Sequence, residues 1–98
     1  MFNNRRSKEI FEWARQYTPG GLNTTTRGLA REIVVTKAKG SRFWDADGNE
    51  YIDYHAAFGP VILGHCHPKV DEKVVETLKH IDLTGIGTSE QEALVAQK

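Results

Sequence analysis

The chain has 98 residues, which fits one small domain or a part of a larger one. Its 13 basic and 13 acidic side chains cancel, so charge gives no reason to expect nucleic acid or an anionic membrane surface as a partner. With 39% apolar residues and a mean hydropathy of −0.51, it has material for a modest core, and no apolar run approaches the roughly 20 residues of a membrane-spanning helix.

The N-terminal residues 1–8 are basic, but no long apolar stretch follows them, so we expect no secretory signal. The single cysteine, Cys66, excludes an internal disulfide framework. Together these features predict a cytoplasmic protein.

The first predicted element is a helix over Ser7–Tyr17. Its apolar residues Ile10, Phe11 and Ala14 recur at helical spacing. Pro and Gly in residues 18–21 end it. The polar segment 22–28 that follows has no periodicity, and we expect an ordered loop or an extended arm.

Three short strands are predicted next, over residues 33–38, 42–46 and 49–54. The first is rich in β-branched residues, and Asp47-Gly48 has the composition of a tight hairpin turn between the other two. Such strands form an antiparallel meander, which needs a helix or a second sheet to cover it.

Residues 69–81 form the clearest predicted helix, directly after Pro68. Their apolar stripe has helical spacing and consists of Val70, Val74, Val75, Leu78 and Ile81. After a glycine-containing loop, Ser89 with Glu92 fits a capping box that starts a further helix. No stop signal follows before Lys98, and we interpret the chain as the beginning of a longer fold.

The stretch His65-Cys66-His67 has the residue types of a metal site or of a catalytic Cys/His pair. Adjacent residues point apart, so the run supplies at most two well-placed ligands, and neighbouring Cys and His rarely meet as nucleophile and base. The residues favour a structural interpretation in which Cys66 is buried, His67 caps the helix that starts at Pro68, and residues 61–63 form a buried connection. We therefore assign no metal ligand and no catalytic residue.

Arg27 lies in a polar, glycine-flanked segment, where an arginine could bind a substrate carboxylate through its planar fork. The competing interpretation is a solvated loop arginine, which the residues alone favour. The glycines at positions 20, 21, 85 and 87 are too few for a phosphate-binding fingerprint, so no cofactor-binding residue is assigned either.

Three motifs in order carry a family resemblance. Residues 17–23 (YTPGGLN), 40–54 (GSRFWDADGNEYIDY) and 59–68 (GPVILGHCHP) resemble the amino-terminal part of class III aminotransferases. These are pyridoxal-phosphate enzymes of fold type I, and the likeness is greatest to the glutamate-1-semialdehyde aminomutase branch. The resemblance covers nearly all of the chain.

The resemblance implies an α+β fold: an N-terminal helix, a three-stranded antiparallel meander and following helices that lead to a large cofactor domain. It implies that Arg27 binds the substrate carboxylate, that Thr24 lies near the substrate, and that Phe58 lines the active-site entrance beside the cofactor. Residues 85–89 resemble a loop that approaches the active site across a dimer interface, which implies a homodimer at full length.

The chain also departs from the family. Aminomutases usually read Asn-Ser-Pro-Val-Arg where residues 23–27 read Asn-Thr-Thr-Thr-Arg, and they carry tryptophan at the place of Phe58. A transaminase acting on another amino acid or an ω-amine fits the residues as well.

In the family, the lysine that binds pyridoxal phosphate lies beyond the place of Lys98. We therefore expect residues 1–98 to be an amino-terminal segment that lacks the cofactor domain and is inactive alone. The alternatives are a small non-enzymatic interaction module and a metal-binding domain centred on His65 and His67.

Overall fold

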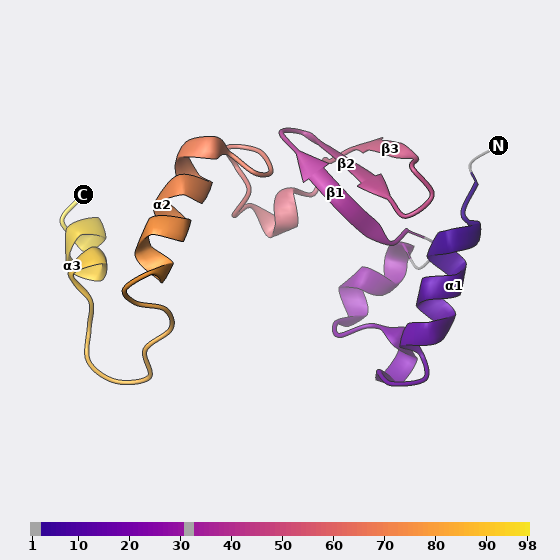
Figure 1. Cartoon of the computed structure of the whole chain (residues 1–98), viewed down its shortest axis with the longest axis horizontal. Coiled ribbons are helices and arrows are strands. Elements are labelled where there is room, and N and C mark those ends of the chain that lie inside the picture. The colour runs from indigo at the N-terminus through magenta and orange to yellow at the C-terminus, as the bar shows by residue number, and fades with distance from the viewer. Residues whose placement is uncertain (1–2, 31–32) are drawn as a thin grey trace. The chain divides into compact units, whose positions relative to one another are not determined.

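The computed structural model describes residues 3–30 and 33–98 and divides the chain into two compact units, Met1–His67 and Pro68–Lys98. Figure 1 traces the helices and a three-stranded sheet of the described residues. The predicted α+β class, with a helix, an antiparallel meander and following helices, is confirmed.

Helix α1 covers Arg5–Ala14, one half-turn earlier than predicted at its start and three residues shorter at its end. The early start has a cause outside the helix, because the backbone N–H groups of Arg6 and Ser7 donate to the carboxylate of Asp47 at 2.7 and 2.8 Å. Residues 15–17 continue only as a turn before the short 3-10 helix η1, Pro19–Gly21. Ser7, whose N–H donates to Asp47, is fully buried.

The segment 22–28, predicted as a loop or extended arm, overlaps a 3-10 helix, η2, over Thr25–Ala30. The prediction was wrong on this point. Short 3-10 turns leave no periodic apolar signal, so the sequence pattern alone could not distinguish one from a loop.

The sheet consists of β1 (Val35–Lys39), β2 (Arg42–Asp45) and β3 (Glu50–Ile52), paired antiparallel in the order β1-β2-β3. The rings of Phe43 and Tyr51 stack across β2 and β3 with their centroids 5.0 Å apart. The register places Lys37 opposite Trp44, and its Nζ lies 4.7 Å from the centre of the indole ring. The meander predicted from the strand and turn signals is therefore present, although each strand is shorter than expected.

The segment after the sheet contains a short 3-10 turn, η3, over Ala56–Phe58. The predicted buried connection beyond it is wrong, because Ile62 is 86% and Leu63 64% exposed. Cys66, expected to be buried, is also exposed. Their apolar character predicted burial, but most of the Ile62 and Leu63 side chains is open to solvent in the described part of the chain.

In the second unit, α2 covers Pro68–Leu78 and α3 covers Glu90–Ala96. The Ser89 side chain accepts the N–H of Glu92 at 3.2 Å, as the capping box predicts. The Glu92 carboxylate accepts from the Thr88 hydroxyl at 2.6 Å, and this bond and the backbone of Ser89 both lower the pKa of Glu92.

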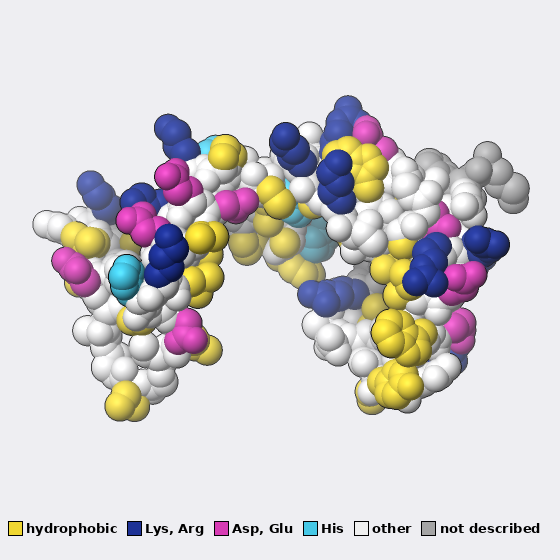
Figure 2. Space-filling model, viewed as in Figure 1, with side chains coloured by type: hydrophobic (Ala, Val, Ile, Leu, Met, Phe, Trp, Pro, Cys, Tyr) yellow, Lys and Arg dark blue, Asp and Glu magenta, His cyan; other side chains and the backbone are white. Residues whose placement is uncertain are grey.

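Large apolar side chains lie at the surface of each unit (Figure 2). Among the residues that the structure describes, no apolar side chain is buried, and the predicted apolar stripe of α2 is open to solvent. Within this described part, no helix has both the length and the apolar character to span a membrane.

Candidate functional site

Asp53 is the centre of a hydrogen-bond network at the end of the sheet. Its Oδ1 accepts the backbone N–H groups of His55 and Ala56 at 2.7 and 3.1 Å. Its Oδ2 lies 2.7 Å from Nε2 of His65. Its own N–H donates to the carbonyl of Ser41 at 2.8 Å. One carboxylate thus connects the sheet, the turn that follows β3 and a histidine twelve residues away.

These partners favour the ionised carboxylate. The N–H of His55 lowers the pKa of Asp53 most, the His65 ring lowers it further, and these effects outweigh the opposing desolvation. The side chain of Asp53 is 10% exposed and that of His65 is 23% exposed, so the pair is largely shielded from water.

The turn beside Asp53 has an uncommon backbone. Ala56, Ala57, Phe58 and Gly59 all have positive φ, at 47, 51, 68 and 110°. Three of them are not glycine, and each L residue in this region costs about 1–2 kcal/mol. Such strain persists only where the surroundings hold it, and it gathers at functional sites.

Phe58 ends this turn and is 73% exposed. Its ring meets the ring of His55 edge to face, with centroids 4.2 Å apart and an interplanar angle of 73°. The structure therefore presents at the surface the aromatic residue that was predicted to line the entrance of an active site.

Arg27 and Thr24 lie elsewhere in the first unit. Arg27 is exposed in η2, and the Thr24 hydroxyl is 3.3 Å from that of Thr26. No hydrogen bond or ring contact joins either of them to Phe58 in the described part of the chain. The three predicted substrate-binding residues are thus all on the surface, and their roles stay predictions.

The stretch His65–His67 forms no metal centre in the described residues, where no three metal-ligating side chains lie close enough to hold an ion. His65 pairs with Asp53, and Cys66 points to solvent with φ of 51°. Nδ1 of His67 is buried and has no hydrogen-bond partner, so this atom does not cap α2 as predicted.

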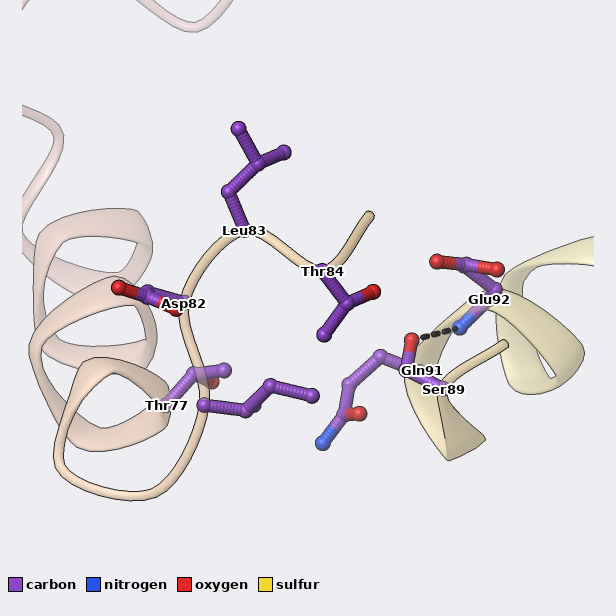
Figure 3. Close-up of a pocket in the computed structure, with 8 residues that line it drawn as sticks. Thr77, Asp82, Leu83, Thr84, Ser89, Gln91 and Glu92 are labelled. Atoms are coloured by element: carbon purple, nitrogen blue, oxygen red, sulfur yellow. Dashed lines mark hydrogen bonds between the residues drawn. The ribbon is translucent and has the colours of Figure 1, made fainter. Parts of the chain in front are cut away.

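A shallow pocket of about 170 Å³ lies within the second unit (Figure 3). The end of α2, the connecting loop and the first turn of α3 line it, with Thr77, Ile81, Asp82, Leu83, Thr84, Ser89, Gln91 and Glu92. It contains none of the predicted substrate-binding residues.

Sequence reasoning missed Asp53 and His65 as a pair. Neither spacing nor composition marks them, because a hydrogen bond across twelve residues depends on the path of the intervening turn. The strained turn itself left one signal in the sequence, the glycine at position 59 that ends it.

Residues 24–98 match the family described as aminotransferase class-III. The chain is 44% identical over 91 residues to a glutamate-1-semialdehyde 2,1-aminomutase from Sulfurihydrogenibium sp. (strain YO3AOP1), an alignment that covers 89% of this chain and 20% of that protein. The chain belongs to the class III aminotransferases, and it spans about one fifth of the length of the curated relatives it matches.

Solved structures agree with this assignment. A transaminase with PLP bound superposes with a TM-score of 0.87 at 26% identity, over 99% of this chain and 23% of that one. A β-phenylalanine aminotransferase from Variovorax paradoxus gives a TM-score of 0.79 at 28% identity, over 96% of this chain and 23% of the other. The predicted beginning of a fold type I transferase is confirmed.

Proposed function

We propose that this chain is the amino-terminal part of a pyridoxal-phosphate-dependent aminotransferase or aminomutase that acts on a carboxylate-bearing amino compound. The observation that carries the proposal is the family match over residues 24–98. The identity to a named aminomutase and the likeness to solved transaminases support it. The complete enzyme is a cytoplasmic homodimer.

In this enzyme Arg27 binds the substrate carboxylate through charge-assisted hydrogen bonds, and its exposed position in η2 leaves the guanidinium accessible. Thr24 lies close to the same substrate group. Phe58 forms an apolar wall beside the cofactor, for which its exposed ring is suited. When bound, the cofactor supplies the electron sink of the reaction.

The described residues do not themselves fit the cofactor. A lysine that binds pyridoxal phosphate works in a desolvated pocket. All lysines of this chain are exposed, namely Lys8, Lys37, Lys39, Lys69, Lys73, Lys79 and Lys98. We therefore expect the 98-residue chain alone to be inactive, with the cofactor held by residues outside it.

The test is a screen of amine donors and keto or aldehyde acceptors with the complete protein. The absorbance of the cofactor should change when a carboxylate-bearing amino compound is added. A complete protein that takes up pyridoxal phosphate and shows no such change with any amino donor would contradict the proposal.

The role of Arg27 has its own test in the complete enzyme. Arg27→Ala should raise KM for carboxylate substrates about ten- to a hundredfold, the effect of losing hydrogen bonds between charged groups, and change KM for simple amines much less. Arg5→Ala is the control, because Arg5 is an exposed arginine of α1. Equal effects on both substrate classes would show that Arg27 does not bind the carboxylate.

A further inference from the structure

The left-handed turn at residues 56–59 needs contacts from outside the turn to keep its backbone conformation. Three consecutive L residues with positive φ are individually unfavourable, and the backbone hydrogen bonds of the turn are short-range: Phe58 N–H donates to His55 O, and the N–H groups of Gly59 and Val61 donate to Ala56 O. Without further contacts, the segment would relax to negative φ and carry the Phe58 ring with it.

Asp53 supplies the first contact. Its Oδ1 accepts both N–H groups at the entry of the turn, from His55 and Ala56, which fixes the direction in which the chain leaves β3. His55 is also the residue whose ring packs against Phe58. The carboxylate therefore acts on Phe58 through one intermediate residue.

The carboxylate of Asp53 is itself fixed by His65. Its Nε2 binds Oδ2 of Asp53, the oxygen that the turn does not use. The backbone of His65 is anchored separately, since its N–H and C=O exchange two hydrogen bonds with Gly40 at 2.8 and 2.9 Å. The ring thus reaches Asp53 from a fixed point at the β1–β2 turn.

We propose that Asp53 and His65 are positioning residues that hold the strained turn at 56–59 and so set the place of the Phe58 ring in the substrate site. The statement about the substrate site rests on the proposed function, whereas the effect on the turn does not.

The test compares variants of His65 in the complete protein. His65→Leu removes the donor to Asp53, while His65→Gln keeps one, because the glutamine amide nitrogen lies as many bonds from Cβ as Nε2 of histidine does. The control is His80→Leu, a change at an exposed histidine of the second unit.

In the kinetic arm, His65→Leu should lower kcat/KM on the order of ten- to a hundredfold, the usual scale for misplacing a contacting group. His65→Gln should stay within about threefold of the parent, since it keeps a donor. Ala57→Gly, which removes the left-handed strain at that residue, should restore part of the loss in the His65→Leu background. Strictly additive effects of Ala57→Gly and His65→Leu would overturn the proposal.

A second arm needs no activity. The complete protein is labelled with 4-fluorophenylalanine, and the ¹⁹F resonance of Phe58 is assigned by its loss in Phe58→Leu. The resonance should move in His65→Leu and in Asp53→Asn, and keep its place in His65→Gln and His80→Leu. If His65→Leu does not fold, Asp53→Asn, which is similar in size to the parent, gives the decisive spectrum.

The kinetic and the ¹⁹F measurements together distinguish a failure of the positioning role from a failure of the proposed function. An unchanged Phe58 resonance in the folded His65→Leu or Asp53→Asn protein overturns the positioning role, whatever the kinetics show. A shifted resonance in a protein that transfers no amino group supports the positioning role and contradicts the proposed function instead.

Discussion

Asp45, at the end of β2, shows how this chain stabilises a buried carboxylate with hydrogen bonds. The residue is 2% exposed, yet each oxygen of its carboxylate has donors. Oδ1 accepts the N–H groups of Asp47 and Asn49, and Oδ2 accepts from the Asn49 amide and the Tyr51 hydroxyl, all within 3.0 Å. Burial raises the pKa of Asp45, but these hydrogen bonds outweigh it, so the pKa lies below its usual value.

A lowered pKa makes stability depend on pH in one direction. The contribution of Asp45 is present above the unfolded-state pKa of about 3.8 and is lost as pH falls through the lower folded-state value. The pKa of Asp53 is lowered as well, so both carboxylates act in the same direction. We expect the free energy of unfolding, measured with urea, to fall steadily below about pH 4.

The substitution Asp45→Asn should reduce the free energy of unfolding by about 1–3 kcal/mol at pH 7, because the amide presents a donor to groups that donate. It should also weaken the dependence on acid pH. Asp82→Asn, at an exposed site, serves as the control and should have little effect. If stability fell just as steeply in acid in Asp45→Asn, the pH dependence would have to come from other titrating groups.

Single residues also show what the sequence could predict of the site. Arg27, Thr24 and Phe58 were singled out through the family resemblance, although they lie outside its three motifs, and their roles remain predictions. Asp53 and His65 stand within the motifs 40–54 and 59–68, but no rule of spacing pairs them. Their interaction depends on the strained turn between them, which local preference would oppose.

At the scale of elements, α1 takes its N-terminal cap from a distant hairpin. Its own N-cap residue, Asn4, makes no side-chain capping bond, and Asp47 accepts two of the first N–H groups instead. A carboxylate at this end also suits the positive end of the helix dipole. Apolar periodicity predicted the helix. The residues next to its start do not indicate a cap that comes from forty residues away, so the predicted start was wrong.

The distant cap makes a specific prediction. Asp47→Ala should leave the N–H groups of Arg6 and Ser7 without acceptors and speed their hydrogen exchange several-fold, with less change beyond the first turn of α1. Ser89→Ala is the matched control, since Ser89 caps α3 from within its own flank. That variant should affect only α3, and protection of the Arg6 and Ser7 amides that survives Asp47→Ala would refute the distant cap.

At the scale of the whole molecule, the close approach of two glycines joins the β1–β2 turn to the segment after η3. A Cβ on Gly64 would lie 2.9 Å from the Cα of Gly40, where no flexible side chain could move aside. The paired hydrogen bonds between Gly40 and His65 lie directly beside this contact. The sequence could not predict this approach, because a contact across 24 residues has no local pattern.

This contact can be tested by two matched substitutions. Gly48 and Gly64 have nearly the same φ, 83 and 85°, but a Cβ on Gly48 would meet nothing within 4 Å. Gly48→Ala should lower the free energy of unfolding by about 1–2 kcal/mol through backbone strain alone. Gly64→Ala should lower it by more, since the clash adds to the same strain, and equal losses would mean that the two backbones can separate freely.

The distant cap of α1 also implies an order of events during synthesis. A helix of ten residues is too short to be stable alone in water. The acceptor that completes its first turn, Asp47, is made 41 and 40 residues after Arg6 and Ser7, so at about 5–20 residues per second it follows them by roughly two to eight seconds. Helix α1 is therefore completed only after the β2–β3 turn has left the ribosome.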